Sequence, residues 1–169
     1  MPNWTDRPPV HTRQHAYSLF RTPAQGTISG IITSPTVLGC LTHFYRGRTI
    51  PCEGENCPAC NDKRPPRYHA YVGLLGKKSR EHALFELTGH AAAPLYDWIE
   101  AGKSLRGAAL NAYRTRGGSN APVTVQLSQM PGLEVVLPEP PDIQAALELI
   151  WGEARSLATN GDSHNAERA

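Results

Sequence analysis

The sequence has no long hydrophobic run, and this absence excludes a membrane-spanning protein. No apolar stretch approaches the roughly 18 residues that a spanning helix needs, so no membrane partner is expected. The first residues, MPNWTDRPPVHTRQ, also lack the apolar centre of a signal peptide. We therefore expect a cytoplasmic protein, in which clustered cysteines favour a bound metal over disulfides.

Common catalytic motifs are missing as well. Neither the Gly-x-Ser-x-Gly of hydrolases nor the phosphate-binding loop of nucleotide hydrolases occurs. The His-x-Glu of zinc deaminases is absent too, although Cys57 and Cys60 match their Cys-x2-Cys half. No helix rich in Arg and Asn is evident for reading duplex DNA. The sequence therefore predicts that the protein is not an enzyme.

Only four cysteines are present, and three of them lie in the segment HFYRGRTIPCEGENCPAC. A Cys-x2-Cys pair places two thiolates on one tight turn, where both can face one ion. A third thiolate and an imidazole complete a tetrahedral site with no position open for a substrate water. The spacing predicts a structural Zn²⁺ held by His43, Cys52, Cys57 and Cys60.

Two alternatives bear on this site. A redox Cys-x2-Cys normally follows a strand and opens a helix, whereas Pro51, Gly54 and Pro58 predict a loop here. Cys40 competes with His43 as the fourth ligand. If both lie on one strand, they point to opposite faces, so only one of them can meet the cysteine loop. We favour His43, and Cys40 between two leucines also has the pattern of a small core residue.

Alternating and β-branched stretches, separated by turns, predict a protein built mainly of strands. The expected strands cover residues 26–33, 37–45, 67–75, 82–88, 105–114 and 122–128. Between the fourth and fifth of these, residues 91–101 have a helical period that ends at Gly102. A second, amphipathic helix is expected after Asp142, its candidate N-cap.

This order predicts an all-β fold with an inserted helix (α+β). The specific expectation is a five-stranded Greek-key barrel of the OB type, with a zinc-binding loop and a C-terminal helix. A generic small antiparallel sheet with helices stays open as the alternative. The expected organisation is an extended arm at 1–25, a barrel at 26–138 with a zinc subdomain at 43–68, an amphipathic helix at 139–158 and a disordered tail at 159–169.

Charge is unevenly distributed along the chain. The net charge is +2, but residues 1–120 hold 15 Lys/Arg against 8 Asp/Glu, and residues 121–169 hold 2 against 7. A basic body predicts a polyanion-binding surface. The acidic C-terminal part is expected to compete with nucleic acid for that surface at low salt.

Aromatic residues alternate with cations around the metal loop and in two later hairpins. Single-stranded nucleic acid is bound by this mixture, because cations follow the phosphates while flat rings stack on unpaired bases. The candidate contacts are Tyr45, Arg46, Arg48, Arg64, Arg67, Tyr68, Lys77, Lys78, Arg106, Tyr113, Arg114 and Arg116. Tyr45 and Tyr68 are the strongest single candidates, whereas strand aromatics such as Phe44 and Tyr71 are more often core residues.

A histidine followed by three cysteines, inside a β-barrel with aromatics and cations, resembles the zinc-containing single-stranded DNA-binding proteins of phages. The segment is also similar to small proteins of bacterial mobile elements, and it covers about a tenth of the chain. The resemblance implies an OB fold, a His-Cys-Cys-Cys zinc site at His43, Cys52, Cys57 and Cys60, and binding of single-stranded DNA without sequence preference in replication or recombination.

The acidic C-terminal part resembles the acidic tails of bacterial single-stranded DNA-binding proteins, which implies that it recruits replication or recombination proteins, although it lacks their terminal acidic-plus-Phe signature. Two other functions stay open. One is a protein–protein adaptor stapled by zinc, and the other is an RNA-binding OB-fold protein.

Overall fold

The computed structural model describes residues 17–130 and 136–162, with the backbone alone for residues 153–162. Most of the expected N-terminal arm, the segment 131–135 and the end of the expected tail, 163–169, lie outside the described residues. In the described part, no helix is both long and apolar enough to cross a membrane.

The described elements follow one another as strands interrupted by short helices. They are β1 (Leu19–Arg21), β2 (Thr27–Ile32), β3 (Leu38–Tyr45), β4 (Arg48–Pro51), the 3-10 helix η1 (Gly54–Asn56), α1 (Pro58–Asn61), β5 (Arg67–Gly76), β6 (His82–Thr88), α2 (Gly89–Glu100), β7 (Ala109–Arg114), β8 (Val123–Ser128) and α3 (Ile143–Asp162). The strands predicted at 26–33, 37–45, 67–75, 82–88 and 122–128 are thus confirmed to within about two residues.

One predicted strand begins later than the pattern indicated. Residues 105–108 are not part of β7, which starts at Ala109. The Ala108 N–H donates to the Leu105 carbonyl, and Gly107 has a φ of 90°, so the chain turns here. Leu105 lies in this turn, and its side chain packs into the core. In the sequence such a buried apolar residue has the pattern of a strand residue, which explains the wrong prediction.

The sheet is mixed and open, which confirms the α+β class but not the closed barrel. Its main path runs β1-β6-β5-β2-β7-β8, and β3 pairs with both β4 and β5. All neighbours are antiparallel except β1, which runs parallel to β6. Among the described residues, no pairing between β6 and β8 closes the sheet into a ring.

Helix α2 covers the inner face of the sheet. Thr88 caps its start, since its Oγ1 accepts a hydrogen bond from the Ala91 N–H at 3.4 Å. Gly102, with a φ of 73°, follows its end as the sequence predicted. Side chains of α2, including the buried Leu95, join those of β5, β6 and β7 in the main core.

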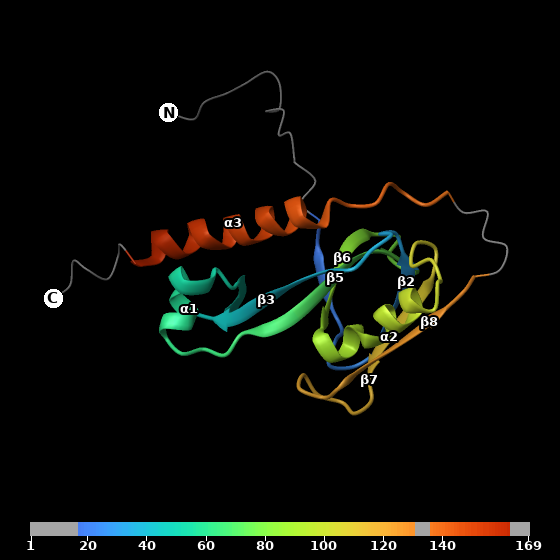
Figure 1. Cartoon of the computed structure of the whole chain (residues 1–169), viewed down its shortest axis with the longest axis horizontal. Helices are drawn as coiled ribbons and strands as arrows, with labels where there is room; N and C mark the ends of the chain where they lie inside the picture. Colours follow the sequence, from blue (N-terminus) through green and yellow to red (C-terminus); the bar gives the residue numbers. More distant parts are fainter. Residues whose placement is uncertain (1–16, 131–135, 163–169) are drawn as a thin grey trace, which may run out of the picture.

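Helix α3 covers the opposite, outer face. A second cluster joins Tyr71 and Leu84 of the sheet to one side of α3, where Leu147 is buried. Pro141, just before the helix, lies directly over Gly73 of β5. Figure 1 shows α3 along one side of the long β3 and β5 strands, with α1 at their far end and α2 beside the body of the sheet.

Candidate metal centre and nucleic-acid interface

A tight hairpin carries the first metal-ligating candidates. Strands β3 and β4 are joined by Arg46 and Gly47, with φ of 48° and 81°, as a two-residue hairpin turn requires. His43 lies on β3 opposite Ile50, and Cys52 follows β4, its N–H donating to the Leu41 carbonyl at 2.8 Å. The hairpin therefore fixes an imidazole and a thiol close to its base.

Two short helical turns supply the other candidates. Cys57 lies between η1 and α1, and Cys60 lies within α1. The segment was predicted as a loop, but Pro58 occupies the first helical turn, where a missing N–H costs nothing. This local structure returns the chain toward the hairpin and brings both thiols under His43.

The four donor atoms fit around one ion. One ligand atom from each of His43, Cys52, Cys57 and Cys60 lies within 4.8 Å of the others. The Cys52 and Cys60 sulfurs are 3.6 Å apart, and the Cys60 sulfur is 3.3 Å from His43 Nε2. A tetrahedral ion with ~2.3 Å bonds to sulfur would hold two sulfurs about 3.8 Å apart. The cluster could therefore bind a metal ion.

The crowding of the thiols also favours a cation between them. Burial raises the pKa of the Cys57 thiol, but backbone N–H groups of Glu53, Cys60 and Ala59 and the Cys60 side chain lower it, and the net pKa is below its usual value. Hydrogen bonding to Cys52, burial and the nearby Cys57 raise the pKa of Cys60 to about 11. Three thiolates can share this space when a metal ion compensates their charge.

Cys40 lies on the other face of the hairpin. It is the register partner of His69 and packs against the second cluster, next to Tyr71. Burial, and then the negative charge of Glu86, raise the pKa of the Cys40 thiol. The prediction that only one of Cys40 and His43 meets the cysteine loop is confirmed, and the residue is His43.

Next to the metal cluster, the hairpin tip forms a hollow of about 400 Å³. Its walls are Phe44, Tyr45, Arg46, Gly47, Asp62 and Arg64. The Tyr45 hydroxyl donates to Asp62 Oδ2 at 2.7 Å, and the Arg46 guanidinium lies over the Tyr45 ring, 5.4 Å from its centre. The structure thus joins Tyr45, Arg46 and Arg64, three predicted nucleic-acid contacts, in one place.

Sequence reasoning missed the most exposed aromatic ring of this region. Phe44 is 68% exposed, although its position on a strand suggested a core residue. Its register partner Thr49 belongs to β4, which pairs with no strand other than β3 in the described sheet. No further layer covers the ring at this edge, so Phe44 stays open to solvent. A strand pattern alone does not reveal such an edge.

The remaining predicted contacts divide between the two ends of β5. Arg67 and Tyr68 are exposed at its start, near the metal cluster, and Arg48 begins β4 opposite Tyr45. Lys77 and Lys78 are exposed in the turn after its end. Ten residues of strand separate these groups by about 30 Å. The two basic groups therefore do not merge into one patch.

Three predicted contacts lie on or near the β7–β8 hairpin. Arg116 is exposed in its turn, and Tyr113 on β7 accepts a long hydrogen bond from Gln126 Nε2 at 3.4 Å. Arg114 is different, because its guanidinium donates to the Ala121 and Thr22 carbonyls. Arg114 therefore joins the hairpin to the segment before β2.

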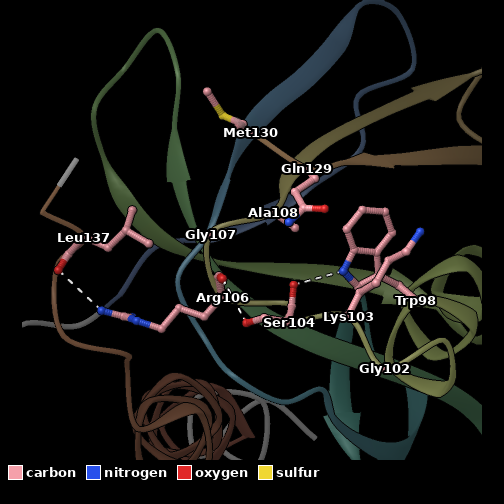
Figure 2. Close-up of a pocket in the computed structure, with 10 residues that line it drawn as sticks. All are labelled: Trp98, Gly102, Lys103, Ser104, Arg106, Gly107, Ala108, Gln129, Met130 and Leu137. Carbon is pink, nitrogen blue, oxygen red and sulfur yellow. Dashed lines mark hydrogen bonds between the residues drawn. The ribbon is translucent and has the colours of Figure 1, made fainter. Parts of the chain in front are cut away.

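Arg106 also bonds to the backbone. Its guanidinium donates to the carbonyl oxygens of Thr33, Leu137 and Pro138. Figure 2 shows the Arg106 side chain extended toward Leu137 and away from Trp98, along a pocket of about 410 Å³ at the end of α2. Its donors hold loops together and are not directed at a ligand.

Comparisons with protein-family models, with curated proteins and with solved structures find no match for this chain.

Proposed function

We propose that this protein binds single-stranded DNA with little sequence preference, acting in replication or recombination, and that a structural Zn²⁺ braces its binding hairpin. The observation that carries the proposal is the hollow at the hairpin tip. There an exposed ring, Phe44, stands beside two exposed arginines, Arg46 and Arg64. Stacking rings and cations at one site are what an unpaired strand requires, since its bases and its phosphates are both accessible.

The strand order supports an OB-type body. β5 pairs with β2 and β6, β2 pairs with β7, and β7 pairs with β8. These pairings, with α2 between β6 and β7, fit a five-stranded partly open Greek-key barrel. In this assignment β2, β5, β6, β7 and β8 are the five strands in order. The metal hairpin then lies in the loop between the first and second strands, one of the loops with which OB folds bind oligonucleotides.

The donor set supports zinc as the metal. Three thiolates and one imidazole are soft and borderline ligands, which suit Zn²⁺ in a tetrahedral site. With four protein ligands the ion has no open position, so it stabilises the fold and supplies no chemistry of its own.

A salt titration tests the function. The zinc-loaded full chain is titrated with an oligo-dT strand, a duplex of equal length and an RNA strand, over a series of salt concentrations. We expect oligo-dT to bind best, with a log–log salt slope of about −0.7 per phosphate neutralised. Arg64→Ala should weaken binding and reduce the slope, while Phe44→Ala should weaken binding and leave the slope nearly unchanged.

The other functions give different results in this titration. Equal affinity for oligo-dT and duplex at low salt would refute the proposal. It would favour the alternative function, a protein–protein adaptor stabilised by zinc. Clearly tighter binding to the RNA strand would identify an RNA-binding protein. Elemental analysis of the purified chain that finds no bound zinc would remove the metal part of the proposal.

A further inference from the structure

We infer that a bound DNA strand leaves the hairpin tip along the outer face of the sheet, where two arginines next to Phe44, Arg67 and Arg21, contact its phosphates. Arg21 is a candidate contact that no motif in the sequence indicated. The inference rests on the proposed function, and it names the path of the strand beyond the hollow at the hairpin tip.

Strand register places Phe44 and Arg67 side by side on the outer face. Tyr71 packs against α3 on this face, and Arg67 lies on the same side of β5, four residues earlier. Arg67 is the register partner of Thr42, and Phe44 follows Thr42 by two residues. Phe44 and Arg67 are therefore diagonal neighbours, with Cα atoms roughly 7–8 Å apart. Both side chains are exposed, Phe44 to 68%.

Arg21 reaches this surface from the other edge of the paired strands. It ends β1 opposite Glu86 of β6, and Glu86 is also the register partner of Tyr71 on the outer face. The Arg21 guanidinium donates to Thr49 Oγ1 of β4 at 3.1 Å, and Thr49 is the register partner of Phe44. In the order of pairing, β6, β5 and β3 separate β1 from β4. The sheet therefore curls so that Arg21 lies beside the strand pair that carries Phe44.

A buried carboxylate fixes the orientation of Arg21. Its Nε donates to Glu86 Oε1 at 2.6 Å and its Nη2 to Glu86 Oε2 at 3.2 Å, while the Glu86 side chain is only 6% exposed. The Arg21 side chain is nevertheless 52% exposed, and none of its hydrogen bonds to described residues uses Nη1. A planar fork held along one edge can offer the other edge to a phosphate, with little conformational entropy left to lose.

His69 lies between the two arginines on the outer face. Its Nδ1 shares a hydrogen bond with Thr42 Oγ1 at 2.5 Å. Burial lowers the pKa of His69, and the negative charge of Glu86 raises it. The positive charges of Arg21 and Arg67 lower it again, so the net pKa is below its usual value. Both arginines are thus close to one imidazole ring, and a single strand can meet both.

Charge complementarity argues for a nucleic-acid strand on this surface. Arg46 and Arg64 are exposed at the hollow, and the two outer-face arginines continue the positive charge past the ring of Phe44. On the inner face, the metal cluster with its fully buried His43 occupies the space behind the hairpin. A protein partner would be expected to meet a contiguous apolar patch, whereas a ring between cations matches bases joined by phosphates.

A salt titration of Arg67→Gln tests the path. Affinities of the zinc-loaded full chain for a short oligo-dT are measured over a series of salt concentrations. Arg67→Gln should reduce the log–log salt slope by about 0.7 and weaken binding about 5-fold at 0.1 M salt, as expected for one lost phosphate contact. Lys78→Gln is the matched control. Lys78 lies beyond the far end of β5, about 30 Å away, so neither quantity should change.

A charge-balanced double variant tests Arg21. Arg21→Gln together with Glu86→Gln leaves the net charge of the chain unchanged and no charged partner buried alone. We expect it to weaken oligo-dT binding about 2- to 10-fold, the range for one net hydrogen bond, because the oriented fork is lost. If the double variant binds like the unmodified chain, the assignment of Arg21 is refuted.

Thr49→Val separates contact with DNA from positioning of the hairpin. It removes the hydrogen bond from Arg21 but keeps the charge of Arg21 and its pairing with Glu86. We expect Thr49→Val to retain most of the affinity and all of the bound metal. If Thr49→Val weakens binding as much as the double variant does, Arg21 only holds the hairpin in place, and its assignment as a phosphate contact is refuted.

Each failure can be assigned. If the unmodified chain binds oligo-dT while Arg67→Gln and the double variant bind it equally well, the path is refuted and the proposed function stands. If the unmodified chain binds no single strand, both are lost. Thermal unfolding shows whether each variant is folded, and if the double variant does not fold, Arg67→Gln against Lys78→Gln still decides the path. A change in sedimentation of Phe44→Ala with unchanged DNA affinity would overturn the inference and assign this surface to contact between two copies of the chain.

Discussion

At the scale of single residues, Arg106 shows why a cation in the sequence is a weak indicator of a phosphate contact. Its guanidinium bonds to three carbonyl oxygens, from Thr33 before β3 and from Leu137 and Pro138 before α3. Carbonyls in turns need donors, and the planar fork of arginine can serve several at once. No composition or spacing argument distinguishes this use from binding a polyanion.

Arg106→Gln should therefore lower stability without changing the salt dependence of DNA binding. Loss of the guanidinium leaves carbonyl groups unsatisfied, so the free energy of unfolding should fall by roughly 1–3 kcal/mol. Urea unfolding measures this loss, and Arg116→Gln, at an exposed turn position, serves as the control with no expected change. A reduced salt slope for Arg106→Gln with unchanged stability would show that Arg106 contacts phosphate after all.

The candidate metal ligands could be predicted at this scale, whereas the exposure of Phe44 could not. Cysteine spacing and the alternation of side chains along a strand are local properties. They correctly predicted that His43, and not Cys40, lies with the three other cysteines. The exposure of Phe44 depends on β4 forming an uncovered edge, and the position of the Tyr68 ring depends on Gly39 of another strand, which leaves room for it. Both follow from pairings that no local pattern encodes.

At the scale of elements, the metal module of β4, η1 and α1 has little stability of its own. The helices η1 and α1 have three and four residues, far below the ~12–15 that an isolated helix needs in water. In the segment from η1 to α1, Cys57 and Ala59 are the buried apolar residues. A metal ion held by the cluster would therefore supply most of the free energy that folds the module.

Removal of the metal should unfold this module and leave the body of the sheet intact. With a chelator present, or in Cys57→Ser, backbone amides of residues 52–64 should lose protection from hydrogen exchange, while those of β6 and α2 keep theirs. Cys40→Ser is the matched control, because Cys40 lies outside the cluster and should leave metal content unchanged. Equal protection of the module with and without metal would contradict a structural role for the ion.

Most elements followed from the sequence because their patterns are strong, and the exceptions have physical reasons. The alternation in β8 and the helical period of α2, which ends at Gly102, are local signals that the structure confirms. β1 has three residues and forms because β6 offers a free edge, with Leu19 opposite Leu84. The turn at 105–108 was predicted as a strand because Leu105, although it lies in a loop, packs into the core as a strand residue would. In both cases tertiary contacts decide the local structure.

At the scale of the whole molecule, the C-terminal segment occupies the outer face of the sheet. A Cβ on Gly73 would come within 2.6 Å of the Pro141 ring, and Trp151 meets Tyr71 edge-on with ring centres 6.1 Å apart. The helical period predicted an amphipathic helix here, but it could not say which surface the apolar side covers. In the proposed OB assignment this surface includes β5 and β6, the second and third strands, whose face binds oligonucleotides in OB folds.

Loosening α3 should therefore lengthen the stretch of DNA that one chain occupies. The two basic groups lie about 30 Å apart at the ends of β5, and α3 covers part of the outer face between them. Trp151→Ala removes the contact between α3 and Tyr71, so bound single-stranded DNA should displace the helix more easily. We expect a larger occluded site in titrations against poly-dT and a steeper salt slope, by about 0.7 for each added phosphate.

Leu149→Ala is the matched control for this experiment, because Leu149 lies on the exposed side of the same helix and should leave both quantities unchanged. The effect of Trp151→Ala should also disappear when Lys77 and Lys78 are both replaced by alanine, since the far basic group would then be gone. A site size and slope that stay the same in Trp151→Ala would mean that α3 is a fixed layer of the fold. The strand would then be confined to the hairpin tip.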